Sequence, residues 1–379
     1  MRLFHNINID FLGKRKFFYI LSGTIFLIGM LNIVFRGLEF GIDFKGGTEI
    51  RLDFQKPIDV AKLRDYVGAM GIGNTELKTF GNETGVLIRT ELQEIPKAIF
   101  PRVTKNIESE INQSIPGLQF QKVDSTVNSV VYQFANADTA TAIANSLVKA
   151  GFQAGRVSNE VSNKQIIVRV GISDWIKQNL RHKIPDNPFT IAKEDKVGPK
   201  VGNELKTNAV IAVFLSLVGI LLYLAFRFKF IFAASAVIAL FHDVLITLGL
   251  YAILYGVIPG LNLEISVTVV AAFLTLIGYS INDTVVVFDR VRETLKLHKD
   301  LDAERNVNDA VNKTLSRTIL TAFTTFLSAI ILMIFGGEVL RSFAFTMAFG
   351  IVIGTYSSVF VASAIVVDYS KKYDKKLEF

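Results

Sequence analysis

Six long apolar stretches run through the chain, and each is long enough to cross a membrane as a helix, which takes about 20 apolar residues. They predict membrane-spanning helices at residues 17–35, 208–226, 230–255, 265–288, 319–335 and 343–367. The last five lie within residues 206–370 and predict one helical bundle, while the first stands apart near the N-terminus. An even number of spans places both termini on the same side of the membrane.

Residues 36–205, between the first two spans, follow a different pattern. Short segments with period-two alternation, short amphipathic helices and turn residues predict an inserted α+β domain. A shift of about 80 residues superimposes two strand–helix–strand–strand patterns, as a duplicated unit would. This favours a repeat of two ferredoxin-like modules, at 48–119 and 126–197. The alternative is that any two small α+β units align equally well, because few residues are identical.

Basic residues gather mainly on one side of the spans. The segments expected inside contain Lys14, Arg15, Lys16, Arg227, Lys229, Arg290, Arg292, Lys296, Lys299, Arg305, Lys313, Lys371, Lys372, Lys375 and Lys376. The short links 256–264 and 336–340 contain none. The positive-inside rule therefore predicts a cytoplasmic N-terminus (1–16), a basic cytoplasmic tail (371–379) and an extracytoplasmic α+β domain. The first stretch ends without a small-residue cleavage site, which favours an uncleaved anchor.

The composition excludes several classes of function. The net charge is +7, but the basic residues gather beside the spans, where they meet anionic lipid, so nucleic-acid binding is not needed to explain them. The chain has no Cys and only four His, so neither a metal site nor a cofactor is predicted. Phosphate-binding loops and hydrolase motifs are also missing from the sequence, which argues against an enzyme.

A polar segment interrupts the apolar stretch 265–288. Within it, Asp283 lies about six residues, or roughly 9 Å, before the charged border at Asp289. An ionised carboxylate at that depth costs about 3 kcal/mol on the most lenient scale, so it needs a partner, a proton or water. Arg317 lies at a similar depth near the start of the fifth span. The two residues predict a proton gate; a static ion pair or a hydrogen-bonded structural carboxylate are the alternatives.

His242 and Asp243 lie near the middle of the third span. Adjacent residues on a helix point about 100° apart, so the two cannot both face lipid at low cost. Because histidine titrates near neutral pH, they favour a proton relay, with a satisfied structural pair as the alternative. Neighbouring spans supply hydroxyl groups, most of them expected to join helices: Thr247, Ser266, Thr268, Thr275, Thr321, Thr324 and Thr325.

Five short motifs resemble the SecF family in order and spacing. They are GIDFKGGT (41–48), VGPKVGNEL (197–205), HDV (242–244), GYSINDTVVVFDRVRE (278–293) and LSRT (315–318). The matched positions are Gly41, Asp43, Gly46, Gly47 and Thr48 at the entry to the inserted domain, Gly198, Pro199 and Gly202 at the return turn, and Gly278, Ser280, Asn282, Thr284, Asp289 and Arg290 around Asp283.

The resemblance implies half of a transporter bundle of the resistance–nodulation–division (RND) type in the bacterial inner membrane. It implies a heterodimer with SecD that uses the proton motive force to complete preprotein export through SecYEG, with SecA acting indirectly and YajC as a further candidate partner. The family's charged residues fall on Asp283 and Arg317. The inserted domain is about twice the family's usual size, which marks residues 120–181 as an insertion or duplication.

Two other functions remain open at this point. A non-pumping membrane scaffold would use the same residues only as structural contacts. Half of a small-molecule RND exporter would need a second large loop between later spans, whereas the link 256–264 is short.

Overall fold

The computed structural model describes residues 8–158, 160, 162–258, 261–298 and 302–373. The chain forms two compact units: a membrane unit, Met1–Phe44 with Glu204–Phe379, and an α+β unit, Lys45–Asn203. Among the described residues, six continuous helical segments have the length and apolar composition to cross a membrane, and the predicted fold class is confirmed.

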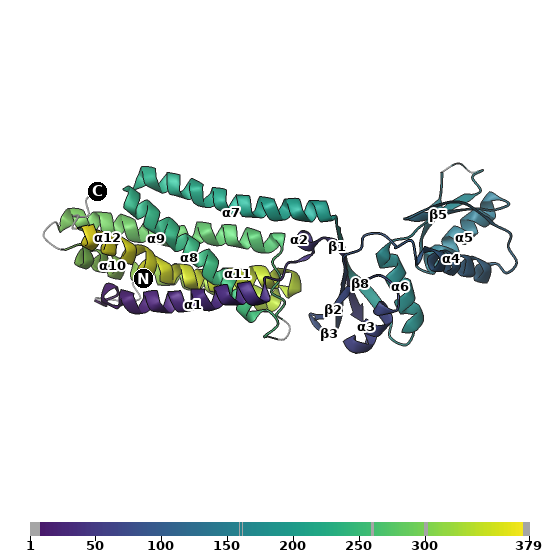
Figure 1. The fold of residues 1–379 in the computed structure, drawn as a ribbon, viewed down its shortest axis with the longest axis horizontal. Coiled ribbons are helices and arrows are strands. Elements are labelled where there is room, and N and C mark those ends of the chain that lie inside the picture. The colour runs from purple at the N-terminus through teal and green to yellow at the C-terminus, as the bar shows by residue number, and fades with distance from the viewer. Residues whose placement is uncertain (1–7, 159, 161, 259–260, 299–301, 374–379) are drawn as a thin grey trace. The chain divides into compact units, whose positions relative to one another are not determined.

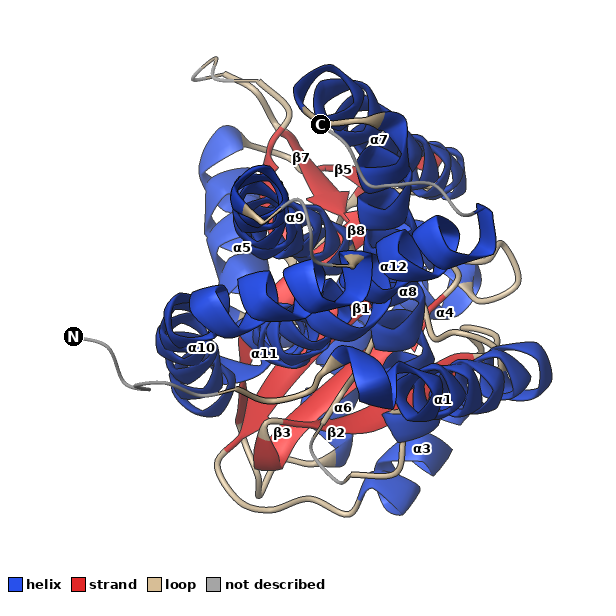
Figure 2. Ribbon diagram, turned by 90° about the vertical axis from the view of Figure 1, so that its left-hand side faces the viewer, coloured by secondary structure: helices blue, strands red, loops and turns tan. Residues whose placement is uncertain are grey.

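The helices of the membrane unit run alongside one another (Figure 1) and are seen end-on in Figure 2. They are α1 (Arg15–Arg36), α7 (Pro199–Arg227), α8 (Phe230–Leu254), α9 (Val267–Leu297), α10 (Ala303–Phe335), α11 (Gly337–Ser357) and α12 (Ser363–Tyr373). A π-helical turn, Ser358–Ala362, joins α11 to α12, and a 3₁₀ turn, Leu12–Lys14, precedes α1. Helix α11 packs against α8, α9 and α10, and α1 packs against α8.

Two helices extend well beyond their apolar stretches, at the end of the bundle where Leu12 and Val367 lie. Helix α9 continues past Asp289 to Leu297, and α10 begins at Ala303, before the predicted span at 319. These extensions are amphipathic, and they bury Val291, Val307 and Val311 in one apolar cluster. A hydropathy window ends where charge begins, so it misses such half-buried turns.

The α+β unit contains two four-stranded antiparallel sheets. The first has the order β2-β3-β1-β8, from β1 (Gly47–Phe54), β2 (Thr75–Phe80), β3 (Asn82–Thr90) and β8 (Phe189–Val197). The second has the order β4-β5-β7-β6, from β4 (Gln121–Thr126), β5 (Ser129–Gln133), β6 (Gln153–Arg156) and β7 (Gln165–Arg169). The helices are α2 (Ile42–Lys45), α3 (Val60–Gly68), α4 (Phe100–Ser114), α5 (Ala137–Lys149) and α6 (Ile172–Lys183). Figure 1 shows α4 and α5 side by side against the second sheet.

The two sheets are built from the same unit in permuted order. The run β1-α3-β2-β3 has the same strand neighbours as β5-α5-β6-β7. The fourth strand pairs with β1 in one sheet and with β5 in the other, but β8 ends its segment whereas β4 begins it. The expected second module, 126–197, is therefore corrected: β8 belongs to the first sheet, and β4 starts before residue 126. An alignment in chain order cannot detect a permuted strand.

The entry to β1 depends on glycine. Gly47 has a φ of 113°, and a Cβ atom there would lie 2.2 Å from the carbonyl oxygen of Thr90 on β3. Gly46 has a φ of 74°, and its Cβ would lie 3.1 Å from Pro199 Cα. Both backbones occupy a region that L side chains rarely adopt. The GG pair of the entry motif is thus needed for close packing at the start of the sheet.

We expect Gly47→Ala to destabilise the α+β unit by about 2 kcal/mol or more, because strain and a backbone clash add together. The measurement is thermal unfolding of the purified protein followed by limited proteolysis of this unit. Gly155→Ala on β6 is the matched control, since a Cβ there meets nothing within 4 Å. Equal stability of the two variants would contradict the packing argument.

Candidate functional site

Among the described residues of the bundle, the most deeply buried carboxylate belongs to Asp243 on α8, which is 1% exposed. Its Oδ2 accepts hydrogen bonds from Ser280 Oγ on α9 at 2.7 Å and from Ser357 Oγ on α11 at 2.9 Å. Its Oδ1 lies 3.0 Å from His242 Nδ1. Three helices therefore converge on one acid group, and both carboxylate oxygens have partners.

Close approach of α11 to α9 is what brings these hydroxyls together. A Cβ atom on Gly354 would lie 2.9 Å from Ser280 Oγ and 3.5 Å from Asp243 Oδ2. One turn earlier, a Cβ on Gly350 would lie 2.4 Å from Leu276 Cδ2. Small residues at such contacts let membrane helices pack backbone to backbone.

The second ring nitrogen of His242 contacts the first helix, α1. Its Nε2 lies 3.0 Å from Ser22 Oγ on α1, and Ser22 Oγ lies 2.7 Å from the hydroxyl of Tyr356 on α11. Tyr356 in turn donates to the carbonyl oxygen of Phe18 at 2.9 Å. Sequence reasoning identified His242 and Asp243 but missed Ser22, Tyr356 and Ser357, since single hydroxyls on distant helices form no local pattern.

Asp283 lies on α9 one helical turn beyond Ser280, and it is 3% exposed. In contrast to Asp243, its Oδ2 has no hydrogen-bond partner. Thr355 on α11 and Arg317 on α10 are the neighbours whose hydroxyl and charge act on this carboxyl group. Within the described part of the chain, Asp283 and Arg317 do not form an ion pair, and Arg317 is exposed. The charge of Arg317 acts on Asp283, but the two residues form no ion pair here, so the gate stays a prediction.

The other residues of the α9 motif face three directions. Thr284 is buried and pairs with Ser358 Oγ of the π-helical turn at 2.9 Å. Gly278 and Asn282 lie on the exposed face of the helix. Asp289 accepts a hydrogen bond from Arg227 at 3.1 Å, and Arg290 pairs with Glu293. The motif therefore combines a buried polar stripe with an exposed one.

The entry motif is attached to the start of α9. Gly41 N donates to Ile265 O at 2.9 Å, and Ile265 N donates to Glu39 O at 2.8 Å. Asp43 Oδ2 accepts a hydrogen bond from Val267 N, the first residue of α9, at 2.9 Å. An acidic group at a helix N-terminus satisfies an unpaired N–H group. Asp43 thus caps the helix that carries Asp283, in addition to its place at the entry to the α+β domain.

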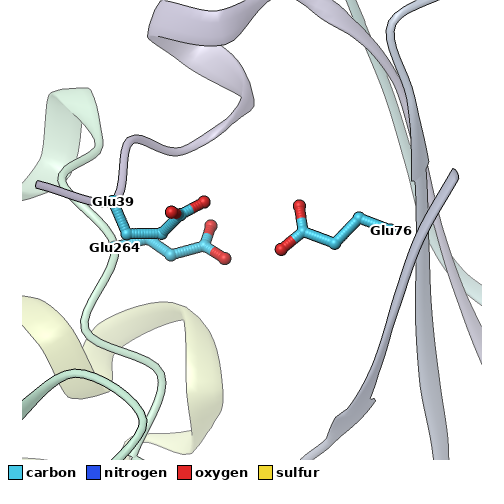
Figure 3. Close-up of side chains that lie close together, drawn as sticks. All are labelled: Glu39, Glu76 and Glu264. Atoms are coloured by element: carbon cyan, nitrogen blue, oxygen red, sulfur yellow. The ribbon is translucent and has the colours of Figure 1, made fainter. Parts of the chain in front are cut away.

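Two acidic side chains lie side by side next to this cap. Figure 3 shows Glu39 and Glu264, whose carboxylate oxygens lie within 4.8 Å of each other. Glu76, also drawn there, belongs to the α+β unit.

The remaining motif residues shape the two junctions. Thr48 Oγ1 donates to Leu92 O at 2.8 Å. On the return path, Gly202 N donates to Gly198 O at 2.9 Å, and Pro199 is the first residue of α7. Proline suits that position because its missing N–H would have no partner there.

A backbone strap fixes the residues before α1 to the first turns of α10. Asn312 accepts a hydrogen bond from Ile9 N and donates one to Ile9 O, both at 2.9 Å. Asn308 accepts from Phe11 N and donates to Ile9 O, also at 2.9 Å. The two asparagines lie one turn apart, so they hold an extended segment along the helix that carries Arg317.

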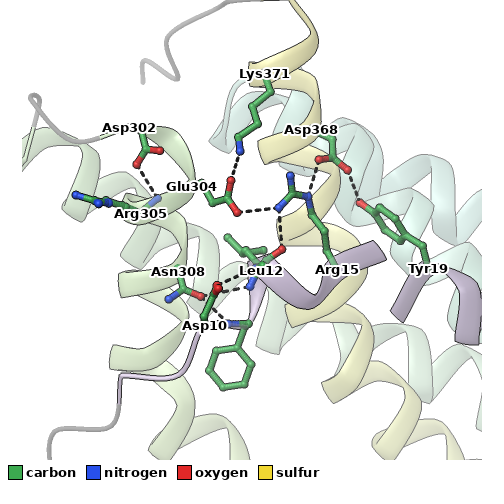
Figure 4. A network of polar contacts seen from close by, with 12 residues as sticks. Asp10, Leu12, Arg15, Tyr19, Asp302, Glu304, Arg305, Asn308, Asp368 and Lys371 are labelled. Atoms are coloured by element: carbon green, nitrogen blue, oxygen red, sulfur yellow. Dashed lines mark hydrogen bonds and ion pairs between the residues drawn. The ribbon is translucent and has the colours of Figure 1, made fainter. Parts of the chain in front are cut away.

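Arg15 joins this strap to the last helix (Figure 4). Its guanidinium donates to Glu304 Oε1 on α10 at 2.8 Å and to Asp368 Oδ1 on α12 at 2.7 Å. Asp368 also accepts from Tyr19, and Lys371 pairs with Glu304. This end of the bundle therefore ties α1, α10 and α12 together.

Known proteins share both the membrane part and the entry motif. Residues 176–372 match the family model described as "Protein export membrane protein SecD/SecF, C-terminal", and residues 32–58 match "SecD/SecF GG Motif". The chain is 37% identical over 362 residues to a "Protein translocase subunit SecF" from Calditerrivibrio nitroreducens, with 95% of this chain and 93% of the relative covered. A protein of the same name from Rhodothermus marinus is 37% identical over 368 residues, with 97% and 95% covered.

Solved structures with a similar fold are longer. "SecDF, a translocon-associated membrane protein" from Thermus thermophilus matches with a TM-score of 0.65 and 27% identity, over 97% of this chain and 39% of that chain. A second structure, "SecDF in Super-membrane-facing form", matches with a TM-score of 0.57 and 28% identity, over 98% and 40%. This chain thus spans about two fifths of each SecDF chain.

We expect Gly354→Ala to loosen the contact between α9 and α11, because the new methyl group would meet Ser280 Oγ at 2.9 Å. Overpacking of this kind costs about 1–3 kcal/mol. Thermal unfolding of the detergent-purified protein measures the loss. Gly219→Ala on α7 is the matched control, because its Cβ meets nothing within 4 Å. A Gly354→Ala protein as stable as the control would show that the close approach is not required.

Proposed function

This chain belongs to the SecD/SecF family of protein export membrane proteins, and from that premise we propose that it is the SecF-type accessory subunit of a bacterial Sec translocase. In this role it forms a heterodimer with SecD and uses the proton motive force to complete preprotein export through SecYEG. SecA acts earlier and indirectly, and YajC is a further candidate partner. The chain is a multi-pass protein of the inner membrane, with both termini cytoplasmic and the α+β unit on the other side.

The observation that carries this proposal is the contrast between two buried acids. Asp243 has partners for both oxygens, as a permanent structural or relay group requires. Asp283 is also buried, at 3% exposed, yet one of its oxygens has no hydrogen-bond partner. An ionised carboxylate left in that state is costly inside a membrane bundle. The arrangement therefore suits an Asp283 that holds a proton here and loses it in another state.

Arg317 is the proposed charge partner of Asp283 in its deprotonated state. It lies on α10, is exposed in the isolated chain and is not paired with Asp283. When Asp283 loses its proton, the carboxylate attracts the guanidinium; when it regains the proton, the attraction ends. A gate of this kind converts proton passage into a shift of α10 relative to α9. The strap at Asn308 and Asn312 would carry that shift to the residues before α1.

The docking face for SecD follows from exposed polar residues at membrane depth. Asn282 on α9 and Arg317, Thr321, Thr324 and Ser328 on α10 are all exposed in the isolated chain. By contrast, α1 and α7 expose large apolar side chains such as Phe35, Phe214 and Phe226, which suit lipid. Because polar residues in membrane proteins face the bundle interior, SecD covers the face formed by α9 and α10.

The scaffold and small-molecule exporter functions make different demands on the structure. A scaffold subunit would also bury Asp243 with three partners, but it would gain nothing from an unpartnered oxygen on Asp283. A small-molecule exporter of the RND type would need a second large insertion, whereas α8 ends at Leu254 and α9 begins at Val267. The export role therefore remains the function that the geometry supports best.

We expect Asp283→Asn to lower gradient-dependent preprotein translocation by about tenfold or more, since an amide cannot exchange a proton; tenfold corresponds to about 1.4 kcal/mol in the activation barrier. The assay is translocation into vesicles with SecD present and an imposed proton gradient. Asp289→Asn is the matched control, because Asp289 pairs with Arg227 at the exposed end of the same helix. Full translocation by Asp283→Asn vesicles would leave only the scaffold function.

We expect Gly278→Trp to prevent co-purification of SecD. Gly278 lies on the exposed face of α9, and a methyl group added there would meet nothing within 4 Å, so an indole would project outward and hold the partner away. Leu215→Trp on the exposed face of α7 is the control and should leave the complex intact. Loss of SecD from the α7 variant alone would place the docking face elsewhere.

A further inference from the structure

We propose that His242 and Asp243 share a single proton in a net-neutral pair, and that Tyr356 and Ser22 are positioning residues that set the direction of its hydrogen bonds, a role that rests on the proton-driven function proposed above. The four side chains come from α1, α8 and α11. Among them, Ser22 and Tyr356 belong to none of the motifs found in the sequence.

A backbone carbonyl fixes which atom donates in each of these hydrogen bonds. Phe18 O can only accept, so the Tyr356 hydroxyl, 2.9 Å away, donates to it. With its only proton used, the Tyr356 oxygen accepts from Ser22 Oγ at 2.7 Å. Ser22 Oγ has then given its own proton, so it accepts from His242 Nε2 at 3.0 Å. The Nε2 atom of His242 must therefore carry hydrogen.

The other side of the imidazole faces the acid. Asp243 Oδ2 accepts hydrogen bonds from Ser280 and Ser357, which leaves Oδ1 at 3.0 Å from His242 Nδ1. A bare Nδ1 and an ionised Oδ1 would be two acceptors facing each other. One proton must therefore lie between Nδ1 and Oδ1. The neutral tautomer with hydrogen on Nδ1 and a bare Nε2 is excluded, because Nε2 already donates to Ser22.

Two protonation states satisfy this geometry, and both have zero net charge. In one, Nδ1 carries the proton, and an imidazolium faces a carboxylate. In the other, the Nδ1–H bond is broken and an Oδ1–H bond is formed, so a neutral imidazole faces a carboxylic acid. The proton moves between the two atoms without creating a net charge at a site where Asp243 is 1% exposed. A neutral pair avoids the cost of an isolated buried charge.

The position of Ser22 is set by a close contact between parallel helices. One heptad beyond Ser22 and His242, Gly29 on α1 meets Gly249 on α8, where a Cβ on Gly29 would lie 2.8 Å from Gly249 Cα. A seven-residue spacing keeps the same faces of two helices in contact. The first helix is therefore held against α8, and the Ser22 hydroxyl is held at His242.

This pair differs in kind from Asp283. It has a donor or acceptor for each of its polar atoms, whereas Asp283 has an oxygen without a partner. We infer that the His242–Asp243 pair keeps its shared proton and stays neutral while Asp283 changes its charge. Tyr356 acts through His242, so it is a positioning residue and not a site of proton exchange.

The test measures the protonation state of the two ring nitrogens of His242. Replacing the other three histidines, His5, His182 and His298, by Gln leaves His242 as the single histidine of the chain. Nitrogen-15 solid-state NMR of this protein in lipid vesicles distinguishes protonated from bare ring nitrogens. We expect a protonated Nε2 in every detectable species. A neutral ring with hydrogen on Nδ1 and a bare Nε2 would overturn the proposal.

Tyr356→Phe tests the positioning role. Without the Tyr356 oxygen, Ser22 can donate to His242 Nε2. We then expect the Nδ1–H tautomer to appear, with the Nε2 proton released to solvent and the remaining proton on Nδ1 facing the Asp243 carboxylate. Tyr369→Phe on α12 is the matched control, because its ring contact with Tyr373, at 4.8 Å between ring centroids, does not need the hydroxyl. An unchanged spectrum in Tyr356→Phe would overturn the role of Tyr356. If that variant does not fold, Ser22→Ala must then change the Nε2 shift, and no change would count against the proposal.

Different results would contradict the shared proton of His242 and Asp243 and the proton-driven export function. The NMR experiment needs no SecD and no gradient, so a protonated Nε2 supports the shared proton even if Asp283→Asn vesicles translocate normally and the proton-driven function is lost. A bare Nε2 overturns the shared proton even if translocation depends on Asp283.

Discussion

The membrane unit is organised around the need to satisfy the Asp243 carboxylate, which it buries among apolar helices. The hydrocarbon core of a bilayer offers no water as a hydrogen-bond donor. Hydroxyl groups from several helices must therefore donate to this acid, and glycines let those helices come close enough. Asp243 is satisfied by His242 together with Ser280 and Ser357, and this requirement fixes how α8, α9 and α11 pack. Asp283 is a buried carboxylate whose Oδ2 has no hydrogen-bond partner, and the proposed change of its charge rests on that contrast with Asp243.

Much of this unit could be predicted from the sequence, because membrane helices carry a strong local signal. Hydropathy located the six spans, and the cost of burying charge pointed to Asp283, Asp243 and His242. Ser22 and Tyr356 could not be found in this way, since a hydroxyl at membrane depth is common and only the fold shows which ones meet. The ion pair expected between Asp283 and Arg317 stays a prediction, because depth along two helices does not determine which faces they turn to each other.

The α+β unit shows a different limit. The strand–helix–strand–strand pattern was visible in both halves because alternation is local, but strand pairing is not. The last strand, β8, returns to β1 across the whole second sheet in sequence, and β4 takes the equivalent place beside β5. Similarly, the role of Asp43 as a cap for α9 joins residues that are far apart in the chain. Contacts of this range need the folded structure.

The pairing of β1 with β8 also determines how the α+β unit would bear tension. Gly47 and Val197 face each other in the register, so the polypeptide enters and leaves the unit at the same end of one ladder. Equal pulls on the two connections act on both strands in one direction, and neither strand slides along the other. The ladder then bears the load as a block, whereas a pull on a single connection along its strand would load the hydrogen bonds between β1 and β8 in shear.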